Sequence, residues 1–130
     1  MPSTTVATPY GYKTVISAPF PATEAASWFE DVKRVVGTPH TFGQLVDLRG
    51  QKPYGEDTNK IIQAAMTYVR ERGMQRSAVI LASAITKMQI MRLAKEAGMY
   101  AYERYFDASS EPAWERKALD WIERGIDPDA

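Results

Sequence analysis

The chain has 130 residues, the size of one domain, and its apolar and charged fractions of 45% and 25% are those of an average soluble protein. Sixteen basic and sixteen acidic residues cancel, which argues against the basic footprint of a nucleic-acid-binding domain. The absence of cysteine excludes disulfides, thiol catalysis and thiolate metal sites. The first residues lack the regions of a signal peptide and no apolar run could span a bilayer, so we expect a cytoplasmic protein.

The first third of the chain predicts a hairpin followed by a helix. Residues 4–8 fit a short edge strand that turns at Pro9-Tyr10-Gly11, and the β-rich residues 12–20 fit a second strand that stops at the prolines. Thr23 is the expected N-cap of a helix that ends at Gly37. Its apolar residues recur at helical spacing, which predicts one buried face.

The middle of the chain repeats the alternation of strand and helix. Residues 42–49 alternate as a strand, and Asp57 or Thr58 is expected to cap a helix that ends at Gly73. The unbroken apolar run at residues 77–83 is typical of a strand that is buried on both faces of a parallel sheet.

The last third predicts two further helices around one strand. Ser83 or Thr86 opens a helix that reaches Gly98, and residues 99–106 alternate as a strand. Ser110 is expected to cap the last helix, with Glu111 and Pro112 in its first turn. The third helix is expected to place these residues on its apolar face: Ile85, Met88, Met91 and Ala94.

This order predicts an α/β domain. Strands separated by helices imply parallel neighbours with right-handed crossovers, hence a mostly parallel sheet of four to five strands with about four helices. Each loop from a strand to a helix then lies at the carboxyl edge of the sheet, where ligands bind in open α/β folds.

The loop between residues 50 and 58 is the candidate binding loop at that edge. It matches no phosphate-loop motif, and the acidic Glu56 and Asp57 occupy the place that an anion would take, so we expect it to recognise a partner or ligand rather than a phosphate. Tyr54 is the expected contact residue because tyrosine offers apolar area with few rotors. The candidate residues are Gly50, Lys52, Pro53, Tyr54, Gly55, Asp57 and Thr58.

No catalytic, metal or cofactor site is predicted. His40 is the only histidine and falls in a helix-to-strand turn at the opposite edge. Asp47 lies near the end of a strand, and a strand aspartate close to an arginine, here Arg49, is commonly a satisfied polar residue. The carboxylates that we considered as acid/base pairs are Asp47, Glu56, Asp57, Glu103 and Asp107.

Three stretches, QLVDLRGQKPYGED, SAVILAS and YERYFDASSEPAWERKALDWIERG, resemble the SpoIIAA-like fold of STAS domains, the anti-sigma-factor antagonists, which is related to CRAL-TRIO lipid-transfer domains. The resemblance implies a single SpoIIAA-like domain over residues 1–130, built as a right-handed superhelix. Antagonists of this family are phosphorylated on a serine where the second helix begins. Here residues 51–59 contain no serine, and Thr58 is the only aliphatic hydroxyl.

Three functions follow as hypotheses. The first is a non-enzymatic regulatory or protein-interaction module that uses the carboxyl-edge loop, with Thr58 as a possible switch hydroxyl. The alternative is a carrier or sensor of a lipid or other apolar small molecule, and the third is a small enzyme using carboxylates near Asp47. The expected partner is a protein or an apolar small molecule; a homodimer is possible, and neither nucleic acid nor a membrane span is expected.

Overall fold

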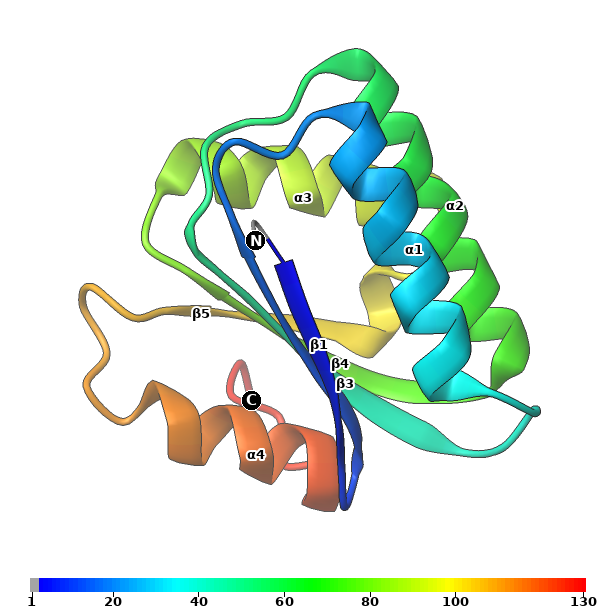
Figure 1. The fold of residues 1–130 in the computed structure, drawn as a ribbon. Coiled ribbons are helices and arrows are strands. Elements are labelled where there is room, and N and C mark those ends of the chain that lie inside the picture. The colour runs from blue at the N-terminus through cyan, green and yellow to red at the C-terminus, as the bar shows by residue number, and fades with distance from the viewer. Residues whose placement is uncertain (1–2) are drawn as a thin grey trace.

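The computed structural model describes residues 3–130 as a five-stranded sheet with four α-helices (Figure 1). The strands lie in chain order across the sheet; β1 runs antiparallel to β2, and all other neighbours are parallel. The predicted α/β class is therefore confirmed. The elements are β1 (Ser3–Thr8), β2 (Gly11–Ser17), α1 (Ala22–Val36), β3 (Phe42–Gly50), α2 (Glu56–Arg72), β4 (Met74–Leu81), α3 (Ala84–Glu96), a 3-10 turn (Tyr100–Tyr102), β5 (Glu103–Asp107) and α4 (Trp114–Arg124).

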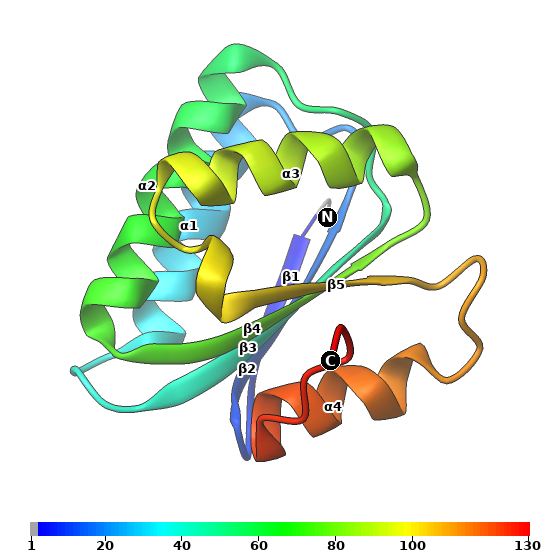
Figure 2. The same cartoon turned by 180° about the vertical axis from the view of Figure 1, so that it is seen from behind.

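The helices form two unequal layers on the sheet. Figures 1 and 2 show α1, α2 and α3 on one face and α4 alone on the other. Each face has its own core, because side chains alternate along every strand. In β4, Val79 and Leu81 join the core under α1–α3, whereas Ala78 and Ile80 join the core under α4. The predicted burial of residues 79–81 on both faces is confirmed.

Three helix starts differ from the sequence prediction. α1 begins after Pro21 and α2 begins after Gly55, and neither cap residue makes a side-chain hydrogen bond. Thr58 caps nothing, because its hydroxyl donates to the backbone oxygen of Phe20. Ser110 lies in a turn, with its N–H bonded to the oxygen of Asp107, so α4 begins only at Trp114.

The buried face of α3 also differs from the prediction. Ser83 caps the helix as expected, accepting the N–H of Thr86. Ala94 is buried as predicted and Met91 is half-buried, but Ile85 and Met88 are exposed, because the first turns of α3 face the sheet and α2 with Thr86 and Ile90 instead. The buried residues of α3 are Thr86, Ile90, Leu93 and Ala94.

The last strand is shorter than predicted. Residues 100–102 form the 3-10 turn, and Gly98, with a φ of 73°, turns the chain before it. Residues 99–106, which the sequence predicted as one strand, therefore include both the 3-10 turn and most of β5. Glu103 becomes the first residue of β5 and is buried, although a charged residue at a strand start is ordinarily exposed.

Candidate functional site

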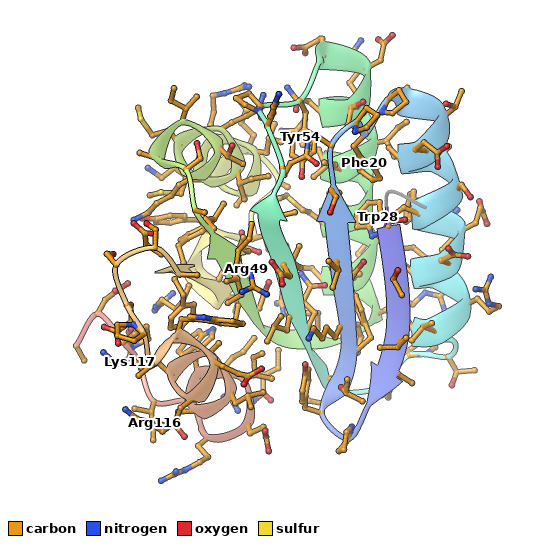
Figure 3. The ribbon with its side chains drawn as sticks, turned by 60° about the vertical axis from the view of Figure 1, so that its left-hand side comes forward. Phe20, Trp28, Arg49, Tyr54, Arg116 and Lys117 are labelled. Atoms are coloured by element: carbon orange, nitrogen blue, oxygen red, sulfur yellow. The ribbon has the colours of Figure 1, made fainter. Side chains whose placement is uncertain are left out.

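The carboxyl-edge loop, residues 51–55, lies where the sequence predicted it, between the end of β3 and the start of α2. It faces residues 18–21, which join β2 to α1, and the two segments enclose a cleft of about 570 Å³, here called the outer cleft. Figure 3 shows Tyr54 and Phe20 side by side at this edge. The outer cleft therefore lies at the carboxyl edge of the parallel strands β2 and β3.

Tyr54 is not the surface contact residue that the sequence suggested. Its side chain is only 7% exposed and packs against Phe20, with ring centroids 5.9 Å apart. Burial raises the pKa of its phenol, and the hydroxyl oxygen has no hydrogen-bond partner among the described residues. The expectation that Tyr54 presents itself to a partner is wrong, because the ring fills the gap between the loop and the helices.

One side chain fastens this loop to α3. The backbone N–H of Tyr54 donates to Gln89 Oε1 at 2.7 Å, and Gln89 Nε2 donates to the backbone oxygen of Tyr54 at 2.9 Å. This pair of bonds, the Gln89 clamp, satisfies both polar groups of a buried residue at once. These two hydrogen bonds therefore fix the loop against α3.

The other predicted loop residues divide into an exposed rim and one buried position. Thr58 is buried, with 3% of its surface exposed, so a kinase cannot reach it in the folded chain. We therefore predict that Thr58, the candidate switch hydroxyl, carries no stoichiometric phosphate, and intact-mass analysis of the protein from cells tests this. The exposed rim consists of Gly50, Lys52, Pro53, Gly55 and Asp57.

An exposed apolar pair lies beside the clamp. Ile85 and Met88, in the first turns of α3, are 68% and 70% exposed, the highest values among the large apolar residues described. Met88 adjoins Gln89 in sequence, and Ile85 lies one helical turn before it, on the same side of the helix. The pair therefore sits on the element that holds the carboxyl-edge loop.

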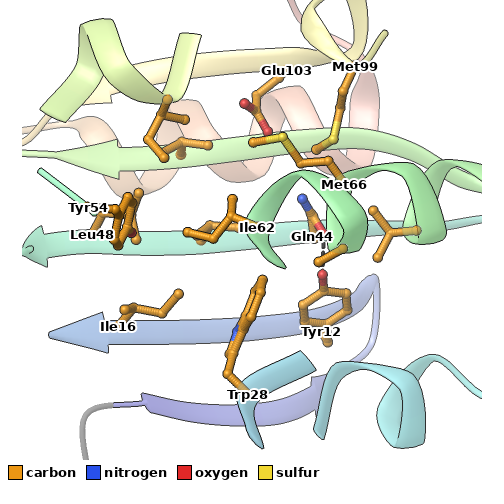
Figure 4. A pocket seen from close by; sticks show the side chains of 15 residues that line it. Tyr12, Ile16, Trp28, Gln44, Leu48, Tyr54, Ile62, Met66, Met99 and Glu103 are labelled. Carbon is orange, nitrogen blue, oxygen red and sulfur yellow. Dashed lines mark hydrogen bonds between the residues drawn. The ribbon is translucent and has the colours of Figure 1, made fainter. Parts of the chain in front are cut away.

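Beneath α1–α3 lies a space of about 40 Å³ lined by buried side chains, here called the inner cavity (Figure 4). It extends from Tyr54 and Leu48 at the carboxyl edge to Tyr12, Gln44 and Glu103 on the strands. Apart from these polar ends its walls are apolar, with Trp28 from α1 and Ile62 and Met66 from α2. A space of this size holds one or a few water molecules and no lipid.

A row of hydrogen-bonded polar side chains crosses four strands at the inner end of this cavity. Tyr12, Gln44, Ser77 and Glu103 are direct cross-strand partners. The Tyr12 hydroxyl donates to Gln44 Oε1, and Gln44 Nε2 donates to Ser77 Oγ at 2.9 Å. Ser77 Oγ donates to Glu103 Oε2 at 2.8 Å. The direction of every bond leads toward the carboxyl group.

Glu103 is the end of that row and its only ionisable carboxyl. Tyr105 donates to its other oxygen, Oε1, at 2.8 Å. Burial raises the pKa of Glu103 to about 7, although the hydrogen bonds from Tyr105 and Ser77 act in the opposite direction. Glu103 is therefore a carboxyl group that changes charge near neutral pH inside an apolar space.

The other groups considered as catalytic do not converge. Asp47 is buried on the α4 side and forms a bidentate pair with Arg49, with distances of 3.1 Å and 2.8 Å. The Arg49 guanidinium in turn lies over the Trp114 ring, between the sheet and α4 (Figure 3). Asp47 is thus the satisfied residue that the sequence indicated. His40 is exposed in its turn, with Nδ1 2.8 Å from the Thr38 oxygen.

The polar row was missed by sequence reasoning. Gln44 stands on an otherwise apolar face of β3, but only the register of four strands reveals that it meets Ser77 and Glu103. The available signal was the position of each polar residue at an inward-facing site. In residues 3–130, no three side chains of the metal-ligating types gather at one place.

No family model, no curated protein and no solved structure matches this chain. None of the helices in residues 3–130 combines the length and apolarity needed to cross a bilayer.

Proposed function

We propose that this protein is a non-enzymatic regulatory module of the STAS-like type that binds a protein partner in the cytoplasm. Its docking surface is the apolar pair Ile85 and Met88 on α3, next to the carboxyl-edge loop. The observation that carries the proposal is the exposure of both side chains beside a loop fastened by Gln89. Contiguous exposed apolar patches on a domain surface mark interaction sites, and this pair supplies the centre of such a patch.

The local structure favours a preorganised surface. Ser83 caps the first turn of α3, and the Gln89 clamp holds the loop against the next turn. A partner therefore meets apolar side chains whose backbone is already ordered, which lowers the entropy lost on binding. The partner segment has apolar side chains that cover Ile85 and Met88, as in the docking of an amphipathic helix.

The alternatives receive less support from the geometry. A carrier of an apolar molecule needs an apolar pocket of about 300–1,000 Å³. The apolar inner cavity has a volume of only about 40 Å³, and the outer cleft, of about 570 Å³, is an open surface cleft whose lining includes the polar residues Gln51, Lys52 and Thr58. A carboxylate enzyme centred on Asp47 needs a free carboxylate, whereas Arg49 occupies both of its oxygens.

Photocrosslinking in the source organism tests the docking surface. A photoreactive amino acid replaces Met88 in one variant and Val6 in a control, because Val6 is also apolar and 49% exposed but lies on edge strand β1. We expect an adduct of defined mass from position 88 that disappears when Ile85→Asp is added. The Ile85→Asp change itself leaves stability within about 0.5 kcal/mol, as is usual for exposed positions.

Two results contradict the proposal. One is the absence of any adduct at position 88, and the other is the same adduct from positions 88 and 6. An adduct with twice the mass of the chain identifies a second copy as the partner, which retains the surface and assigns it to a homodimer.

A further inference from the structure

The exposed side of α3 changes its chemical character along the helix. Ile85 and Met88 are exposed near its start, and Arg92 and Lys95 are exposed near its end. Successive members of this set are three or four residues apart, so their side chains lie along one line of the helix. This line of four residues, here called the α3 stripe, is therefore apolar in its first half and basic in its second half.

The basic half of the α3 stripe is a local excess of positive charge on a chain whose charges cancel. The helix carries three basic side chains, Lys87, Arg92 and Lys95, and one acidic side chain, Glu96, so its net charge is +2. Its first turn contains no acidic residue. Among the described residues Lys95 forms no ion pair, and its ammonium lies 4.7 Å from the centre of the exposed Tyr100 ring.

The single acidic residue of α3 does not cancel this charge. Glu96 pairs with Arg92 at 3.4 Å, and both side chains are more than half exposed, so the pair contributes little. The Glu96 carboxylate also accepts a hydrogen bond of 2.6 Å from Gln63, which holds it toward α2. A partner that lies along the α3 stripe therefore meets one free ammonium and one weakly paired guanidinium.

Two alternative occupants complement the α3 stripe poorly. In a dimer with a two-fold axis, two antiparallel stripes would place the basic half of each against the apolar half of the other. The cations would then lose water without gaining acidic partners. A helix that lies in a membrane surface inserts a broad apolar face, whereas the apolar face of α3, with Ile90 and Leu93, is buried in the protein.

We propose that the docking surface takes an acidic amphipathic helix of a partner protein, which lies along the whole α3 stripe. Apolar side chains of the partner cover Ile85 and Met88, and its Asp or Glu side chains pair with Arg92 and Lys95. The charge of the partner follows from complementarity, because opposite charges across an interface select the partner and its orientation. The length follows from the α3 stripe, which extends over about 15 Å of helix from Ile85 to Lys95.

This inference rests on the proposed function, because it names the partner of the same surface, but the two can fail separately. A protein adduct at position 88 whose yield is unchanged when Arg92 and Lys95 are neutralised keeps the docking surface and rejects the acidic helix. Absence of any adduct at position 88 rejects the docking function itself.

NMR titration with three stapled helical peptides tests the charge of the partner. The acidic probe has leucines along one face and glutamates beside them over about four turns, and the basic probe has lysine in place of each glutamate. The scrambled probe keeps the acidic composition but spreads its leucines around the helix. We expect the acidic probe to bind at least about tenfold more tightly than the other two, with amide shift changes along the α3 stripe.

Neutral variants separate the charges on the α3 stripe from a charge beside it. Lys95→Gln should reduce the preference for the acidic probe by at least about threefold, and addition of Arg92→Gln should remove it. Lys87→Gln is the matched control, because it removes one charge from the same helix at a position that lies off the stripe, and it should preserve the preference. Added salt should narrow the preference of the wild-type chain.

The proposal is overturned if the basic or the scrambled probe binds as well as the acidic probe, or if no probe binds. It is also overturned if Lys87→Gln reduces the preference as much as Lys95→Gln does. Vesicles of phosphatidylcholine and phosphatidylserine that sediment the wild-type chain but not the Arg92→Gln, Lys95→Gln variant would assign the stripe to a membrane surface instead. Circular dichroism checks that each variant is folded; should one unfold, the three probes on the wild-type chain decide alone.

Discussion

A carboxyl group inside an apolar core must replace its hydration with hydrogen bonds or give up its charge. Glu103 does part of each: Ser77 and Tyr105 bond to its oxygens, and burial still raises its pKa to about 7. The other titratable groups close to it are the phenols of Tyr12 and Tyr105, whose own pKa values are raised, so both stay neutral. Glu103 forms no ion pair in the described structure.

The stability of the protein should therefore depend on pH through Glu103. The folded state binds this proton more tightly than the unfolded state, where the pKa is about 4.5. The contribution is fully present below pH 4.5 and is lost as the pH rises to about 7, a total of about 3 kcal/mol from the shift between these values. Urea unfolding between pH 4 and 8 measures it.

Two variants test whether Glu103 is the source of this pH dependence of stability. Glu103→Gln cannot ionise and should flatten the profile between pH 4.5 and 7, whereas Asp107→Asn should keep it. Asp107 is exposed, and its hydrogen bonds from Ser109 lower its pKa, so its own contribution belongs below this window and has the opposite sign. A wild-type profile that is flat, or that rises, would show that Glu103 is ionised without cost.

Tyr54 offers a second test at the scale of one atom. Its hydroxyl is buried without a partner, so Tyr54→Phe removes an unsatisfied group and should hold or raise the free energy of unfolding by about 1 kcal/mol. Tyr54→Ala removes a buried ring instead and should cost about 3–5 kcal/mol. Denaturant melts of both variants measure this. A loss above 1 kcal/mol for the phenylalanine variant would mean that the hydroxyl has an ordered water as its partner.

Helices and strands whose apolar residues recur at regular spacing could be predicted from the sequence, but the residues at which they begin and end could not. Ala25, Trp28 and Val32 recur at helical spacing and are all buried in α1, as the pattern indicated. The predictions of where the helices begin were wrong because Thr23 and Ser110 are good N-cap residues by type, whereas tertiary contacts decide where a helix begins. The prediction of the buried face of α3 was wrong in its first turns. Ile85 and Met88 fit an apolar stripe as well as Ile90 and Leu93 do, and only contacts with α2 and β4 decide which stripe is buried.

The Gln89 clamp makes a prediction at the scale of two elements. Gln89→Ala leaves the N–H and oxygen of buried Tyr54 without side-chain partners and should cost about 1–3 kcal/mol. Amide exchange should rise across residues 51–55 more than in the centre of α3. The matched control is Arg92→Ala, a neighbouring α3 position that is exposed and forms an ion pair with Glu96. Equal exchange in the two variants would show that the loop is held by packing alone.

Across the whole molecule, the layered fold could be predicted because local signals add up to it. The alternation of strands and helices defines the parallel sheet, and the apolar run in β4 marks a strand that is covered on both faces. The candidate site depends instead on contacts between residues that are far apart in the sequence. That Tyr12, Gln44, Ser77 and Glu103 lie opposite one another follows from strand register, which no local pattern contains.

Because helices cover both faces of β4, truncation of a buried side chain in this strand should be costly. Leu81 is 2% exposed at the carboxyl end of β4, in the core under α1–α3. Leu81→Ala should reduce the free energy of unfolding by about 2–5 kcal/mol, as large-to-small core changes do. Val6→Ala, on the edge strand and 49% exposed, is the control and should stay within about 0.5 kcal/mol. A loss at Leu81 no larger than the control would contradict the burial of that strand end.

The polar row also has a consequence for how the chain avoids misfolding. Four strands of similar apolar composition could pair in several offsets during folding. A slip of one residue in β3 would turn Gln44 toward Trp121 and α4. Ser77 and Glu103 would then lose the hydrogen-bonded row to Gln44 and remain in an apolar layer. Each orphaned group costs about 1–3 kcal/mol. The hydrogen bonds of the row therefore disfavour this slip and favour the native alignment of the four strands.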